Sequence, residues 1–110
     1  MDTVKVCNAL GNKTRYNIVK SMKNKSISTC CNKIEYFENG VSVGDVVKLT
    51  GLAQSTVSQH LFVLEKAGIL YKEKRDTWTC YFLNTKLLEE FLEELGRDLS
   101  PELSCGANDC

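Results

Sequence analysis

Cysteine is the residue type in this chain with the widest choice of chemistry, and the 110 residues contain six of them. Cys30 and Cys31 are adjacent, whereas Cys105 and Cys110 lie five residues apart around a Gly-Ala turn. Adjacent Cα atoms lie about 3.8 Å apart and a relaxed disulfide needs roughly 4.4 to 6.8 Å, so a bond within the first pair is disfavoured. Soft sulfur ligands select soft metals and metalloids. We therefore predict that these two pairs ligate a thiophilic ion or undergo thiol redox chemistry.

The other two cysteines are weaker candidates. Trivalent arsenic prefers three sulfur ligands, so Cys30 and Cys31 would need a third thiolate from one of the four remaining cysteines. Cys80 alternates with Trp78 and Phe82 on one face of an expected strand, which favours a small buried side chain. Cys7 lies among apolar residues of an expected helix, where packing and ligation are equally open.

The stretch GLAQSTVSQHLFVLEKAGI, residues 51–69, carries a second kind of chemistry. On a helical wheel, Val57, Leu61 and Leu64 form a compact apolar stripe, and the opposite face is small, polar and uncharged. A merely solvated face would favour Glu and Lys, because Ser and Thr lower helix propensity. Gln can bind adenine through two hydrogen bonds, and Ser and Thr can contact several bases. The helix is therefore predicted to read base edges in a DNA major groove through Gln54, Ser55, Thr56, Ser58, Gln59 and His60.

Two alternatives stay open for this helix. Its polar face could be an ordinary solvated surface, and His60 could bind a phosphate or cap a carbonyl group instead of reading a base. The segments ILYKEK and TWTCYFL, on either side of Arg75 and Asp76, favour DNA binding because they predict a β-hairpin beside the helix. Its Lys72, Lys74 and Arg75 can bind phosphates next to the groove.

Apolar spacing and stop signals predict the elements that position these residues. Helices are expected from near the N-terminus to residue 10 and over residues 12–23, 43–50, 54–67 and 85–99. Two helices joined by a turn of about four residues that includes Gly51 form a helix-turn-helix. Between them and the N-terminal helices, residues 26–40 predict a long connection with one extended piece around residues 34–37.

Composition and charge limit the function classes. With 43% apolar and 25% charged residues, the chain predicts one domain over residues 1–99 and a cysteine-containing tail over 100–110. Its net charge is zero, but residues 1–84 hold 12 basic and 7 acidic residues (+5), and residues 85–110 hold 2 and 7 (−5). Only the first part suits a polyanion. The leucine stripe of the last helix predicts a partner helix, either in a second copy or within the monomer.

The chain has no run of 18 apolar residues and no apolar core of a secretion signal, so we expect a cytoplasmic protein without a membrane partner. In that compartment six cysteines indicate metal binding or redox chemistry rather than a disulfide framework. A small thiol enzyme is the alternative from another class. It is disfavoured, because the chain lacks a CxxC pair and its one histidine lies on the predicted DNA-reading helix, which leaves no general base.

The segments ALGNKTRYNIVKSM, SVGDVVKLTGLAQSTVSQHLFVLEKAGIL and TWTCYFL resemble the ArsR/SmtB winged helix-turn-helix repressors over roughly residues 5–95. The resemblance implies a mostly helical fold with a β-hairpin wing and a homodimer formed through the first and last helices. It further implies a palindromic double-stranded DNA operator, release when an inducer binds, and no required cofactor.

The chain departs from the family pattern at several positions. Ala53 stands where the family usually has a serine that caps the recognition helix, and Phe62 stands where Lys or Arg is common. The Cys-x-Cys pair of arsenite and cadmium sensors corresponds to Ser42 and Gly44. The family's zinc site in the last helix needs histidines, and His60 is the only one.

The leading interpretation is a repressor released from DNA by a thiophilic metal or metalloid, arsenite first. The alternatives are a repressor that senses oxidants or persulfide through its thiols, a regulator without an inducer, and a winged helix that binds only proteins. The uncharged Ser, Thr and Gln face favours bases over a protein partner.

Overall fold

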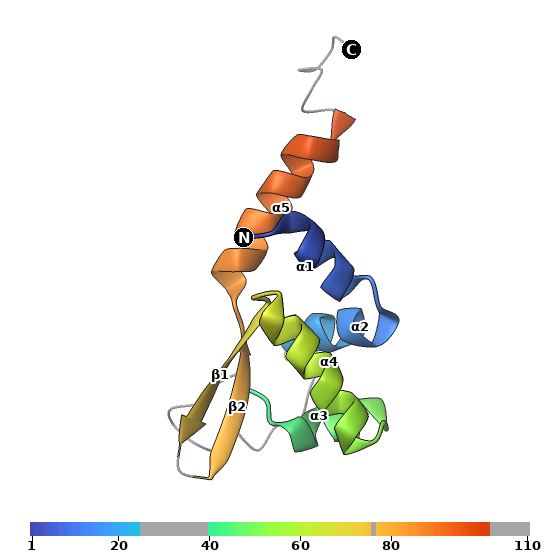
Figure 1. Cartoon of the computed structure of the whole chain (residues 1–110), viewed down its shortest axis with the longest axis vertical. Helices are drawn as coiled ribbons and strands as arrows, with labels where there is room; N and C mark the ends of the chain where they lie inside the picture. Colours follow the sequence, from blue (N-terminus) through green and yellow to red (C-terminus); the bar gives the residue numbers. More distant parts are fainter. Residues whose placement is uncertain (25–39, 76, 102–110) are drawn as a thin grey trace.

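The computed structural model describes residues 1–24, 40–75 and 77–101 (Figure 1). Along the chain the elements are α1 (Thr3–Leu10), α2 (Lys13–Lys23), α3 (Val43–Thr50), α4 (Gln54–Lys66), β1 (Leu70–Arg75), β2 (Trp78–Leu83) and α5 (Thr85–Leu99). The fold is therefore mostly helical with a two-stranded antiparallel hairpin, which confirms the predicted winged helix-turn-helix class. The extended piece expected around residues 34–37 lies outside the described residues.

Capping side chains and glycines mark the ends of α1, α2 and α3. α1 ends at Gly11, and the side chain of Asn12 then caps α2 by accepting a hydrogen bond from the Arg15 amide at 3.1 Å. The side chains of Ser42 and Asp45 form a capping box at the start of α3. Gly51 ends α3 in the left-handed region with φ of 73°, a conformation that suits glycine.

The hairpin forms the wing. Its strands pair antiparallel with Leu70 opposite Leu83 and Lys72 opposite Tyr81. The backbone of Val41 adds an isolated bridge to Tyr81 through hydrogen bonds of 2.7 and 2.9 Å. The wing is thereby joined to the chain just before α3.

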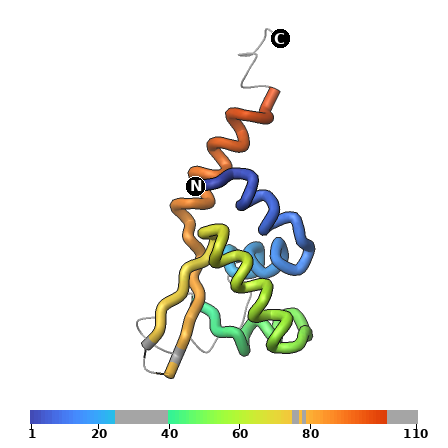
Figure 2. The backbone as a smooth tube through the Cα atoms, viewed as in Figure 1, coloured from blue at the N-terminus to red at the C-terminus, as the bar shows by residue number. Residues whose placement is uncertain are grey.

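The core is centred on α4, which packs against α1, α2, α3 and β1. The backbone trace in Figure 2 shows α4 running through the middle of the body. Val57, Leu61 and Leu64 are completely buried, as the predicted apolar stripe requires. By contrast, α5 runs away from the body and buries only Phe91 (Figure 1).

None of the helices in the described part of the chain is long and apolar enough to cross a membrane.

Candidate nucleic-acid interface

The outward face of α4 has the composition that the sequence predicts. Gln54, Ser55, Ser58 and Gln59 are exposed, and Thr56 is half-buried. Because the buried stripe on the opposite side fixes the rotation of the helix, these polar groups can only face outward. Their contact with bases stays a prediction, but the arrangement leaves them free to enter a groove.

The N-terminus of α4 lacks a side-chain cap, since Ala53 occupies the N-cap position and makes no such hydrogen bond. The preceding turn is held by Thr50 instead. Its hydroxyl donates to the Val46 carbonyl at 2.9 Å and accepts from the Leu52 amide at 3.2 Å. Thr50 thus holds the turn between α3 and α4, whereas no side chain caps the N-terminus of α4.

Two further residues belong to this outward face. The Phe62 side chain is 58% exposed, and the Lys66 Nζ lies 5.7 Å from the centre of the Phe62 ring, in cation–π range. Both follow Gln59 on the same side of the helix, where the helical wheel places them. Sequence reasoning noted Phe62 only as a departure from the family and missed Lys66, although the wheel could have found it.

The wing contributes basic side chains unequally. Lys72 is exposed but lies 3.8 Å from the Glu65 carboxylate on α4, so part of its charge is already balanced. Lys74 is exposed. The Arg75 side chain lies outside the described part of the structure. Of the three predicted phosphate contacts, Lys74 is therefore the exposed side chain that forms no ion pair within the described part of the chain.

His60 is oriented by a residue from another helix. Its ring is half-buried, and its Nδ1 lies 3.3 Å from Nη1 of Arg15 on α2. Burial, and secondarily the nearby Arg15 charge, lower the pKa of His60 from its ordinary value of 6.5. The ring is accordingly neutral at pH 7, and only Nε2 remains for the predicted DNA contact. Sequence reasoning missed Arg15 because nothing in the local pattern points to it.

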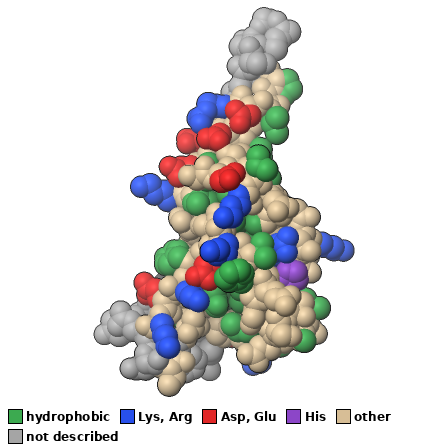
Figure 3. All heavy atoms as spheres, in the orientation of Figure 1, with side chains coloured by type: hydrophobic (Ala, Val, Ile, Leu, Met, Phe, Trp, Pro, Cys, Tyr) green, Lys and Arg blue, Asp and Glu red, His purple; other side chains and the backbone are tan. Residues whose placement is uncertain are grey.

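The charge on this side of the molecule is divided between its two ends (Figure 3). Lys and Arg side chains outnumber acidic ones over α4 and the wing, where Glu65 and Glu73 also lie, whereas acidic side chains predominate on α5, which also carries Lys86 and Arg97. Glu89, Glu90 and Glu93 are exposed there. A polyanion would therefore be attracted to α4 and the wing and repelled by α5.

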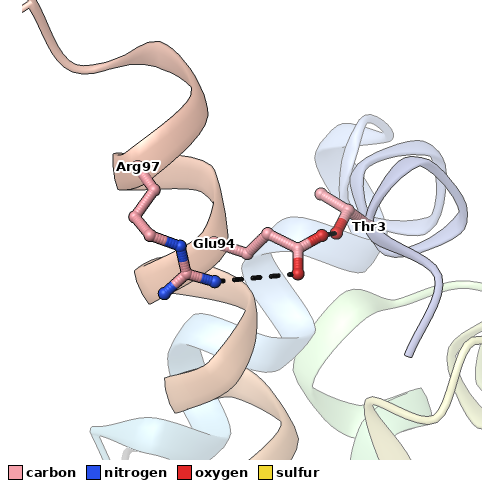
Figure 4. A network of polar contacts seen from close by, with 3 residues as sticks. All are labelled: Thr3, Glu94 and Arg97. Atoms are coloured by element: carbon pink, nitrogen blue, oxygen red, sulfur yellow. Dashed lines mark hydrogen bonds and ion pairs between the residues drawn. The ribbon is translucent and has the colours of Figure 1, made fainter. Parts of the chain in front are cut away.

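α1 and α5 lie side by side and expose apolar residues. The Thr3 hydroxyl donates to the Glu94 carboxylate, whose other oxygen lies 3.9 Å from the Arg97 guanidinium (Figure 4). Beyond this contact, Val4 is 76% exposed and Leu92 63% exposed. The two helices thus present apolar surface that the described part of the chain does not cover.

Two of the six cysteines, Cys7 and Cys80, lie in the described part of the structure. Cys80 is completely buried on β2, as its alternation predicts, but its sulfur is disulfide-bonded, so the expectation of a reduced packing cysteine without a disulfide is wrong for Cys80. Cys7 on α1 is exposed and free. The predicted ligands Cys30, Cys31, Cys105 and Cys110 lie outside the described residues. Among residues 1–24, 40–75 and 77–101, no group of three or more His, Cys, Asp or Glu side chains is arranged to hold a metal ion.

Comparisons with known proteins agree with this geometry. Residues 38–72, which include α3, the turn and α4, match the family model "Bacterial regulatory protein, arsR family". Over 92 residues the chain is 33% identical to a putative arsenical resistance operon repressor, ArsR2, of Halobacterium salinarum, with 84% of this chain and 66% of that protein covered. Over 73 residues it is 36% identical to an arsenical resistance operon repressor of Bacillus subtilis, with 62% and 63% covered. The chain thus spans about two thirds of the length of these relatives.

Among solved structures, the chain is similar to a homodimeric winged helix-turn-helix DNA-binding domain from Mycobacterium bovis. That match has a TM-score of 0.62 and 20% identity, and it covers 90% of this chain and 81% of the other. At this level of identity the likeness concerns the fold.

Proposed function

Because this chain belongs to the ArsR family of bacterial regulatory proteins, we propose that it is a homodimeric repressor that arsenite releases from a DNA operator. Membership in a family of regulators also identifies it as a regulator rather than a thiol enzyme. The proposal has three parts, namely DNA binding, dimerisation and the inducer, and each rests on a different region of the chain.

DNA binding is supported by one observation above all, the outward face of α4. A fully buried stripe of Val57, Leu61 and Leu64 turns uncharged hydrogen-bonding side chains toward solvent. Lys66 and Lys74 lie on α4 and the wing beside that face and are exposed. Uncharged groups that read bases, flanked by cations that bind phosphates, are the two components of specific DNA recognition.

Dimerisation is supported by the apolar surface of α1 and α5. Val4 and Leu92 are exposed on adjacent helices, and a second copy would cover them. The similar Mycobacterium bovis domain is described as homodimeric. A dimer would also place two α4 helices on two half-sites, which suits a palindromic double-stranded operator.

The inducer is proposed from chemistry and from relatives. Both relatives are named as repressors of arsenical resistance operons. We propose Cys30, Cys31, Cys105 and Cys110 as the thiolates that supply the sulfur ligands of trivalent arsenic. Each thiol that binds arsenous acid replaces one hydroxyl group and releases one water molecule.

Fluorescence anisotropy of the reduced full-length protein on labelled DNA from upstream of its own gene tests the proposal. Under anaerobic conditions, arsenite is expected to release the DNA near one equivalent per subunit or per dimer. Cys30→Ser and Cys31→Ser should abolish release while keeping DNA binding, and Cys7→Ser on α1 serves as the matched control. Continued binding in excess arsenite would contradict arsenite as the inducer, and no binding to the labelled DNA would contradict the proposed repressor function.

A second candidate inducer is favoured by one specific observation, the disulfide-bonded sulfur of the buried Cys80. Oxidation of two thiols by hydrogen peroxide forms one disulfide and two water molecules, and it could change the packing of the wing. Adding peroxide in place of arsenite to the same DNA complex tests this thiol switch. Release by peroxide that dithiothreitol reverses, and that Cys80→Ser abolishes, would favour it over the metalloid.

A further inference from the structure

The side chain of Arg15 joins three helices. It belongs to α2, and its Nε donates to the Ala9 carbonyl of α1 at 2.7 Å. Its Nη2 lies 3.5 Å from the Asn8 carbonyl of α1, and its Nη1 lies 3.3 Å from Nδ1 of His60 on α4. The last carbonyl groups of a helix have no partner within the helix and carry its negative end, so a guanidinium is well placed there.

The contact between Arg15 and His60 determines which ring nitrogen of His60 carries the proton. A guanidinium only donates hydrogen bonds, so Nδ1 of His60 must accept, and the ring proton must then be on Nε2. Protonation of Nδ1 would place a cation against Arg15, and this repulsion adds to burial in lowering the pKa of His60. The ring orientation is thereby tied to the position of Arg15.

We propose that Arg15 is a positioning residue that holds His60 in its Nε2–H form and ties the recognition helix α4 to the C-terminal end of α1. Helix α1 also carries the exposed Val4 of the proposed dimer surface, whereas His60 follows directly after Gln59 on α4. The Arg15 contact therefore connects the dimerising helix with the base-reading face. The inference that Arg15 affects operator affinity rests on the proposed DNA binding through α4. The contact between Arg15 and His60 does not depend on that proposal.

The state of the ring can be measured without DNA. His60 is the only histidine in the chain, so histidine-labelled full-length protein gives one set of ring signals in nitrogen-detected NMR. We expect the Nε2–H tautomer and a pKa below 6.5. Arg15→Gln removes the guanidinium and should raise the pKa of His60, whereas Lys13→Gln, the loss of an exposed charge from the same helix, should leave it unchanged.

A double-mutant cycle on operator DNA tests the coupling. Arg15→Gln and His60→Gln should each weaken specific binding on the order of tenfold, and the double variant should bind no more weakly than either single one, because both remove the same contact. Arg15→Lys keeps the charge but not the planar fork, so it should restore binding only in part. It also replaces Arg15→Gln if that variant does not fold.

The outcomes are distinct. An Nδ1–H tautomer, or equal pKa changes in the Arg15 and Lys13 variants, would overturn the contact. Additive losses near a hundredfold in the double variant would mean that Arg15 contacts DNA by itself, which overturns the positioning role. If the wild-type protein binds no operator, the proposed function fails, and the NMR measurement still decides whether Arg15 holds His60.

Discussion

The helices α4 and α5, at opposite ends of the molecule, differ in which kind of side chain they leave exposed. In α4 the stripe of Val57, Leu61 and Leu64 is buried, and the outward face is polar apart from Phe62, so this end needs no second chain to cover its core side. In α5 only Phe91 is buried, and Leu92 and Leu99 are 63% and 71% exposed among acidic neighbours. Exposure alone therefore does not define the kind of partner that a helix binds. Polar exposure on α4 suits DNA, whereas apolar exposure on α5 suits a protein surface.

The largest effect should come from placing a charge on the apolar side of α5. Leu92 is mostly exposed, so Leu92→Glu leaves the core of one chain intact but buries a charge in the proposed dimer. We expect a monomer in sedimentation at micromolar concentration. Because a monomer reaches only one half-site, operator affinity should fall roughly a hundredfold or more.

Leu49→Glu is the matched control for the sedimentation experiment, because Leu49 is an exposed leucine of α3, away from α1 and α5. It should leave the dimer mass unchanged. A dimer mass and full operator affinity for Leu92→Glu would place the protein contact elsewhere, and the contrast between the two ends would then fail.

A smaller effect is expected from the polar face of α4. Gln59→Ala removes two hydrogen-bonding groups from a base-reading position and should cost about 1 to 3 kcal/mol in specific binding. It should also relax the preference at one base pair, which binding to a set of single-base operator variants measures. Asn17→Ala, which removes an exposed amide from α2, is the control. Equal losses on operator and unrelated DNA would remove Gln59 from base readout.

A third effect, smaller again, is expected on the salt dependence of DNA affinity when a lysine of the wing is neutralised. Lys74→Gln should reduce the slope of log affinity against log salt by about 0.9, the value for one phosphate contact on duplex DNA. Lys86→Gln removes an exposed lysine from α5 and should leave the slope unchanged. Because Lys72 is paired with Glu65, its substitution should change the slope less than that of Lys74. A slope unaffected by Lys74→Gln would place the wing away from DNA.

The sequence predicted the features that depend on local periodicity, but not the contacts between residues that are distant along the chain. The buried stripe of α4 and the burial of Cys80 follow from local periodicity, which the sequence contains directly. The contact between Arg15 and His60 joins residues 45 positions apart. It depends on how α1, α2 and α4 pack, and no local pattern encodes that packing. The prediction that His60 reads a base therefore lacked the residue that orients its ring.

The smallest effect is expected on the free energy of unfolding when the N-caps of the helix-turn-helix are changed. A side chain caps α3, whereas none caps α4. Ala53 has the extended backbone of an N-cap, with φ of −63° and ψ of 150°, so a serine fits without strain. In Ala53→Ser the new hydroxyl can accept from a free amide in the first turn, which should raise the free energy of unfolding by about 1 kcal/mol. Ser42→Ala, which removes half of the capping box of α3, should lower it by a similar amount. Urea unfolding at one fixed protein concentration measures both. If Ala53→Ser does not raise the urea midpoint, a hydroxyl at the N-cap adds no stability to α4, and the serine that is usual in the family at this position would then serve DNA binding rather than stability.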